Sequence, residues 1–109
     1  MTTIEARAPY ATLINVFTVE PEHAQELADL LGAATAEVMQ HLDGFISANI
    51  HVSTDSTRVA NYAQWESLAA MQAMQANPTA REHMVKAAAL ATSFEPHLYR
   101  VESVHTREV

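Results

Sequence analysis

The chain has 109 residues, 49% of them hydrophobic, which is the size of one domain with enough apolar side chains for a packed core. Thirteen acidic and six basic side chains give a formal charge of -7, which disfavours nucleic acid and anionic membranes as partners. The absence of cysteine excludes disulfides, a thiol nucleophile and thiolate metal sites. Because no apolar leader or membrane-length apolar run is found, we expect a cytoplasmic protein with a single domain over residues 1–109, with flexible ends at 1–9 and 105–109.

The first two elements are a strand and a helix. Residues 10–19, "YATLINVFTV", are rich in β-branched and aromatic side chains and predict a strand. From Pro21 onwards apolar residues recur at steps of three and four, which predicts an amphipathic helix of about five turns. Its apolar positions are Ala24, Leu27, Leu31, Ala34, Val38 and Leu42. Pro21 suits the first turn, and Gly44 suits the end because glycine adopts the left-handed conformation at little cost.

A hairpin and a broken helix follow. Residues 45–52, "FISANIHV", and 58–65, "RVANYAQW", have the length and composition of strands and flank the turn-forming loop "STDST". Ser67 is placed to cap a helix over "LAAMQAMQA", and Asn77 to cap a continuation over "TAREHMVKAAALA". Pro78 separates the two helices because proline lacks the amide donor.

The last strand is expected over residues 97–104, "HLYRVESV", with Pro96 setting its start. The resulting order, βαββαβ, is that of the split βαβ or ferredoxin-like α+β fold, in which an antiparallel sheet carries both helices on one face. The opposite face would be bare. A second copy of the chain covers such a face most simply, so we expect a homodimer packed sheet against sheet.

Alternation along residues 58–65 puts four side chains on one face, namely Val59, Asn61, Ala63 and Trp65. The pairing register decides which residues of 45–52 join them, because a shift by one residue exchanges the faces. One register adds Ile46, Ala48, Ile50 and Val52. The other adds Phe45, Ser47, Asn49 and His51. We expect the first, which gives the helices one apolar face to cover and turns His51 towards a second subunit.

Asn61 is then the one amide on an apolar face, where an unpaired amide costs about 1–3 kcal/mol. Either a nearby backbone group satisfies it, or it belongs to a binding site. The same two interpretations apply to Trp65, the only tryptophan, as a core ring at the seam of sheet and helices or as a site residue. Met71, Met74 and Met84 either fill the core or form an adaptable wall for a planar ligand.

Other site motifs are missing from the sequence. The six histidines, at 23, 41, 51, 83, 97 and 105, include no pair at the spacing that places two metal ligands side by side. With only Gly32 and Gly44 there is no phosphate-binding loop or dinucleotide fingerprint, and G-x-S-x-G is also missing. We therefore expect no metal and no cofactor.

The stretch "GFISANIHVSTDSTRVANYAQWES", residues 44–67, resembles the antibiotic biosynthesis monooxygenase superfamily. It is most similar to the small cofactor-independent members that oxidise anthrones to quinones in aromatic polyketide pathways. The resemblance implies a dimeric α/β barrel made of two ferredoxin-like units, each with a pocket between sheet and helices. It also implies that Asn61 and Trp65 are catalytic and that the partners are O2 and a small aromatic substrate, against which we place Met71, Met74 and Met84.

The chain departs from this family in the second helical region. Where some relatives add a tyrosine and an arginine, it has Met71 and Met84, with Arg81 and His83 close by. Haem-degrading members need a histidine where this chain has Gln75, which disfavours haem. We expect a cofactor-free monooxygenase acting on an anthrone-like or polycyclic phenolic compound. The alternatives are a dimeric ligand-binding or stress-related domain, or an isomerase or a scavenger of reactive carbonyl compounds with the same fold.

Overall fold

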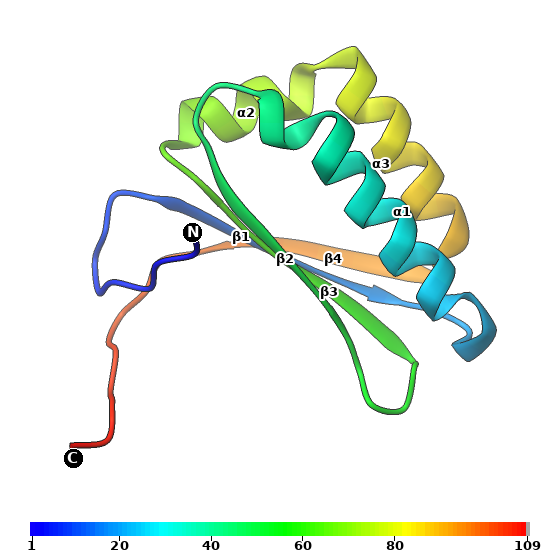
Figure 1. Cartoon of the computed structure of the whole chain (residues 1–109), viewed down its shortest axis with the longest axis horizontal. Coiled ribbons are helices and arrows are strands. Elements are labelled where there is room, and N and C mark those ends of the chain that lie inside the picture. The colour runs from blue at the N-terminus through cyan, green and yellow to red at the C-terminus, as the bar shows by residue number, and fades with distance from the viewer. Residues whose placement is uncertain (109) are drawn as a thin grey trace.

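A computed structural model, which describes residues 1–108, contains one four-stranded antiparallel sheet with its helices on one face (Figure 1). The strands are β1 (Ala11–Thr18), β2 (Phe45–Val52), β3 (Arg58–Trp65) and β4 (Ser93–Tyr99), in the spatial order β2-β3-β1-β4. The helices are α1 (Ala24–Glu37), α2 (Leu68–Ala76) and α3 (Pro78–Leu90). This order confirms the predicted ferredoxin-like α+β fold. No helix in the described part is long and apolar enough to cross a membrane.

The first helical region is shorter than predicted. A 3-10 turn, η1 (Pro21–His23), precedes α1, and a second, η2 (Met39–His41), follows it. Val38, with φ -125° and ψ -65°, breaks the α-helix. The break turns Val38, Met39 and Leu42 onto the buried cluster around Trp65. Gly44 then has φ +82°, the left-handed conformation that its position predicted.

The caps of α2 and α3 are as predicted. The Ser67 hydroxyl accepts the Ala70 amide at 3.1 Å, and the Asn77 side-chain oxygen accepts the Ala80 amide at 3.0 Å. Pro78 begins α3, where a missing amide donor costs nothing.

The pairing of β2 with β3 largely confirms the expected register. Ala48, Ile50 and Val52 lie opposite Ala63, Asn61 and Val59, on the face that the helices cover. The prediction is wrong for Ile46, because an irregularity between Phe45 and Ser47 puts Phe45 opposite Trp65 instead. The two rings meet edge to face with centroids 5.3 Å apart.

The hairpin loop is organised around Asp55. Its carboxylate accepts the Thr57 hydroxyl at 2.7 Å, the Thr57 amide at 3.0 Å and the Ser53 hydroxyl at 2.8 Å. These hydrogen bonds, led by that of the Thr57 hydroxyl, lower the pKa of Asp55 from 3.8 to about 2.

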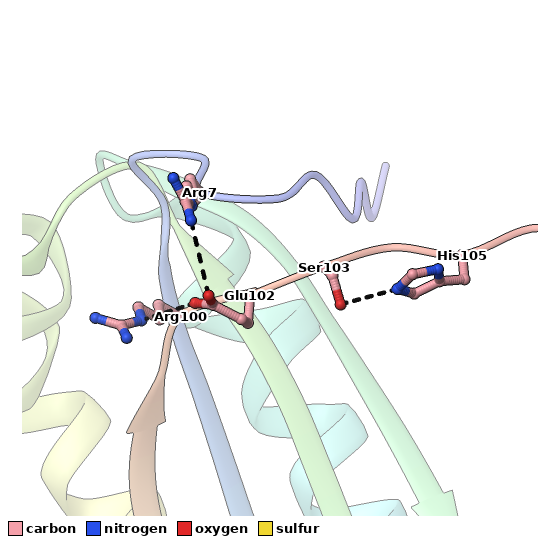
Figure 2. Close-up of polar contacts among 5 residues, drawn as sticks. All are labelled: Arg7, Arg100, Glu102, Ser103 and His105. Carbon is pink, nitrogen blue, oxygen red and sulfur yellow. Dashed lines mark hydrogen bonds and ion pairs between the residues drawn. The ribbon is translucent and has the colours of Figure 1, made fainter.

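The last strand was predicted too late in the chain. It runs over Ser93–Tyr99 rather than 97–104, and Pro96 lies inside it, opposite Asn15 of β1. An edge strand tolerates proline because its outer side has no neighbour to bond. Beyond the sheet, the Arg7 amide donates to the Val101 carbonyl at 2.9 Å. Figure 2 shows the Glu102 carboxylate between the guanidinium groups of Arg7 (3.8 Å) and Arg100 (3.3 Å).

The sheet face opposite the helices is partly covered by the N-terminal segment. The Gln64 amide accepts from the Thr3 backbone N–H at 3.1 Å and donates to the Thr3 carbonyl at 2.5 Å, and Gln64 is only 1% exposed. The Thr2 hydroxyl donates to Asn49 at 2.9 Å. The face is therefore not bare at this end, whereas Val16 further along β1 is 37% exposed.

The core has two parts under the helices. One lies at the far end of β1 and consists of Phe17, Val19, Ala24, Leu27, Val59 and Ala87. The other surrounds Trp65 and includes Met71, Met74 and Ala80. On β3, Asn61 and Ala63 lie between Val59 of the first cluster and Trp65 of the second, and neither residue belongs to a cluster.

Candidate active site

A cavity occupies the gap between the two core clusters, enclosed by the sheet on one side and the helices on the other. It measures about 90 Å³ for the centre of a water-sized sphere. This is several times the roughly 10–15 Å³ that one water requires, so the cavity has room for an organic group. Its wall is lined by Leu13, Asn15, Leu31, Ala34, Thr35, Met39, Phe45, Ala48, Asn61, Ala63, Trp65, Met74, His83 and Met84.

Three buried polar atoms on this wall lack a hydrogen-bond partner among residues 1–108. They are the side-chain oxygens of Asn15 and Asn61 and the indole nitrogen of Trp65. Within the described chain these are the only buried side-chain nitrogen or oxygen atoms in that condition. Native proteins satisfy nearly all such groups, so their concentration in one cavity indicates a ligand that would satisfy them.

Strand pairing determines how the three groups are arranged. Asn15 of β1 lies directly opposite Asn61 of β3 in the antiparallel register. Trp65 is on the same face of β3, because alternate residues of a strand point the same way. An amide presents an acceptor or a donor by rotating about its last bond, whereas the indole nitrogen only donates. Together they can hold a substrate oxygen from two directions.

The packing around Trp65 fixes its ring. Phe45 meets it edge on, and Met71 and Met74 belong to the same buried cluster. The Glu66 amide donates to the Gly44 carbonyl at 2.7 Å, which ties the end of β3 to the turn that precedes β2. Trp65 is only 2% exposed, so its indole N–H is held in place before any ligand arrives.

Four of the five predicted site residues line the cavity, namely Asn61, Trp65, Met74 and Met84. Met71 does not: it is buried within the Trp65 cluster and is not part of the cavity wall. Sequence reasoning missed Asn15. The signal was available, because Asn15 is the one amide on the alternating row Ala11, Leu13, Asn15 and Phe17, just as Asn61 is on its own row.

The helical region α3 contributes His83 and Met84 to the wall. Arg81 instead lines a separate hollow on the outer side of α3, with Glu82, Val85 and Lys86. His51 is exposed on the face away from the helices, where its ring nitrogen lies 3.2 Å from the Asn49 carbonyl oxygen. Within residues 1–108, no three histidine, aspartate or glutamate side chains are grouped so as to hold a metal ion.

The chemistry of the cavity is that of an apolar binding site with few polar groups. Aliphatic, aromatic and methionine side chains form most of its wall, which suits a flat hydrophobic ring system. Two amides and an indole N–H can orient a bound ligand by forming hydrogen bonds to one of its oxygen atoms. Neutral donors of this kind can stabilise developing negative charge, most strongly where water is excluded.

Comparison with known proteins gives consistent results. The family model described as antibiotic biosynthesis monooxygenase matches residues 11–86. A curated relative, the tetracenomycin-F1 monooxygenase of Streptomyces glaucescens, is 45% identical over 83 residues, which span 76% of this chain and 74% of the relative.

Solved structures with the same fold include two oxygenases. One is a monooxygenase from the ActVA-Orf6 gene of Streptomyces coelicolor in complex with nanaomycin D. It is 27% identical, with a TM-score of 0.82 and coverage of 94% of this chain and 95% of that one. Another is SnoaB, a cofactor-independent oxygenase of Streptomyces nogalater, with a TM-score of 0.79 over 89% of this chain and 97% of that one. At 21% identity the second likeness shows the fold alone.

Proposed function

The chain belongs to the antibiotic biosynthesis monooxygenase family, and from this membership we propose that it oxidises an anthrone-like or polycyclic phenolic compound to a quinone with O2 and no bound cofactor. That it is a monooxygenase follows from the family and from its 45% identical relative. The observation that carries the finer proposal is the cavity itself, in which three unpaired polar atoms face an otherwise apolar space.

In the proposed reaction the substrate supplies the electrons. Its deprotonated enol or phenol transfers one electron to O2, and the resulting radical and superoxide combine to form a carbon–oxygen bond. The peroxide that results is protonated, loses the remaining hydrogen from the same carbon and breaks its O–O bond. One oxygen atom stays as the quinone carbonyl and the other leaves in water, so two hydrogens of the substrate are exchanged for one oxygen.

The residues of the cavity have different parts in this scheme. The NH2 group of Asn61, with that of Asn15 opposite, donates to the substrate or peroxide oxygen and stabilises its negative charge. Trp65 donates its indole N–H and orients the ring system, while Met74 and Met84 contact the ring faces. Met71 packs in the buried cluster around Trp65.

We also propose the homodimer that the sequence predicts. Its support is the edge strand β4, on which every residue is exposed, including Phe94 (48%), Leu98 (51%) and Tyr99 (50%). Phe94 and Leu98 share one face of β4 and Tyr99 lies on the other. Exposed apolar side chains of this kind favour a protein partner, and a second copy is the simplest one. Sedimentation equilibrium tests this: a mass of one chain at micromolar concentration would contradict it.

Activity is tested by incubating the purified protein with anthrone, with and without O2, and following quinone formation by absorbance. We expect O2-dependent product well above the spontaneous rate, at one O2 consumed for each quinone. Asn61→Ala and Trp65→Phe should reduce that rate, whereas His51→Gln, on the other face, should not. Product formation at the spontaneous rate by the folded wild-type protein would refute the proposal.

A further inference from the structure

We infer that His83 accepts the proton of the bound substrate and later returns it to the peroxide oxygen. This inference rests on the proposed function, because it assigns the proton transfers of that reaction to a residue. Its starting point is the composition of the cavity wall. Among the residues that line the cavity, His83 alone has an ionisable side chain.

None of the other five histidines lines the cavity, and four of them have a hydrogen-bond or ion-pair partner. His23 pairs with Glu26 at 3.3 Å, and His97 packs edge on against the ring of Tyr99. The remaining three lie within hydrogen-bonding distance of oxygen atoms: His41 of the Ala36 carbonyl, His51 of the Asn49 carbonyl and His105 of the Ser103 hydroxyl. Neither ring nitrogen of His83 has a hydrogen-bond or ion-pair partner in the described chain. An imidazole without such a partner is free to bond a substrate hydroxyl.

The surroundings of His83 favour this transfer. From the sheet, the cavity presents only apolar side chains, two amides and the Trp65 indole. From α1, η2 and α2 it presents aliphatic side chains, methionines and the Thr35 hydroxyl. The charged neighbours on α3, Arg81, Glu82 and Lys86, line the outer hollow instead. No carboxylate lines the cavity, so an imidazolium formed there would face the substrate anion across the cavity, and each ion would stabilise the other.

The proton balance closes over one turnover. A neutral imidazole nitrogen takes the proton of the phenolic or enolic O–H, which leaves an anion that can reduce O2 and an imidazolium. After the carbon–oxygen bond forms, the imidazolium gives its proton to the distal peroxide oxygen and becomes neutral again. His83 thus acts first as base and then as acid, and no proton is gained or lost by the protein.

The first test is anaerobic binding of a fluorescent hydroxyanthracene, whose neutral and ionised forms have different absorption spectra. Wild type should bind the ionised form at pH 7, whereas His83→Gln should bind the neutral form. The matched control is His51→Gln, the same substitution on the opposite face of the sheet. A structural role for His83 would change the affinity and leave the spectrum of the bound ligand as in wild type.

The second test is aerobic turnover of the same compound against pH. In His83→Gln we expect kcat to fall by at least about 100-fold with a small change in KM, and the wild-type pH dependence of kcat to disappear. His83→Ala should be equally slow and should be rescued by added imidazole. Suppose that wild type turns over the compound and that His83→Gln has the wild-type rate and pH profile and still binds the ionised form of the ligand. The role of His83 is then refuted while the proposed function stands. A wild type without O2-dependent turnover refutes both.

Discussion

Replacing Asn61 by leucine should make the protein more stable and inactive at the same time. The Asn61 side-chain oxygen is buried with no partner among residues 1–108. An unpaired buried amide costs about 1–3 kcal/mol, and leucine removes that cost while filling part of the adjoining cavity. We therefore expect Asn61→Leu to raise the free energy of unfolding by about 1–3 kcal/mol. For a domain of this size, each kcal/mol corresponds to roughly 4–8 °C in Tm.

The same substitution removes a group that we place against the substrate or peroxide oxygen. Loss of one such hydrogen bond typically lowers kcat by about 100- to 1,000-fold, so the variant should be nearly inactive. Thermal melts at equal protein concentration and the anthrone assay measure the two effects on one preparation. Opposite changes in stability and activity distinguish a site residue from a structural one.

Asn49→Leu is the matched control. Asn49 also lies on a strand and is partly buried, but its amide donates to the Tyr62 carbonyl at 3.1 Å and accepts from the Thr2 hydroxyl at 2.9 Å. Leucine there leaves these partners unpaired, so the variant should lose about 1–3 kcal/mol and keep its activity. If Asn61→Leu instead destabilises the protein as much as Asn49→Leu, Asn61 has a structural partner and our reasoning about the cavity is wrong.

Further predictions concern single residues. Trp65→Phe removes the indole donor and should lower kcat by about 100-fold in the anthrone assay, and unchanged kcat would contradict its role. Gly44→Ala should destabilise by more than about 1 kcal/mol in thermal melts, because φ is +82° and the new Cβ would lie 2.5 Å from that of Ala70. Gly32→Ala, with nothing within 4 Å, should stabilise by about 0.5–1 kcal/mol. Folding lowers the pKa of Asp55 from 3.8 to about 2, so its contribution to stability is full above pH 3.8 and is lost as pH falls through 2. Relative to Asp55→Asn, wild-type stability measured by urea unfolding should therefore decline over that range, and parallel curves would contradict this.

The elements that could be predicted are those with local signals. Ser67, Asn77 and Gly44 act within one turn of their own position, so the caps and the left-handed turn follow from the sequence. Pro96 shows the opposite case. Read locally, it marks the start of a strand, but it lies within β4 because that strand is at the edge of the sheet. An edge is a property of the assembled sheet, which no local pattern contains.

Part of the site could be predicted because side chains alternate between the two faces of a strand, which is called strand parity here. Parity put Asn61 and Trp65 on one face, and the structure places both on the cavity wall. That Asn15 faces Asn61 depends on β1 lying next to β3, a pairing between distant segments. The two methionines of α2, Met71 and Met74, are both buried, and only the orientation of the helix over the sheet makes Met74 the one that reaches the cavity.

The charge of the protein bears on the choice of these groups. With a formal charge of -7, the chain is a poor host for an anionic substrate that approaches through water. O2 and a neutral phenolic compound are not repelled, so in the proposed reaction the anion forms only after binding. Carboxylates on the wall would then oppose that anion, whereas the amides of Asn15 and Asn61 are neutral and can donate hydrogen bonds to it through their NH2 groups. Among the described residues the wall of the cavity accordingly has no acidic side chain, and the proposed proton transfer falls to His83.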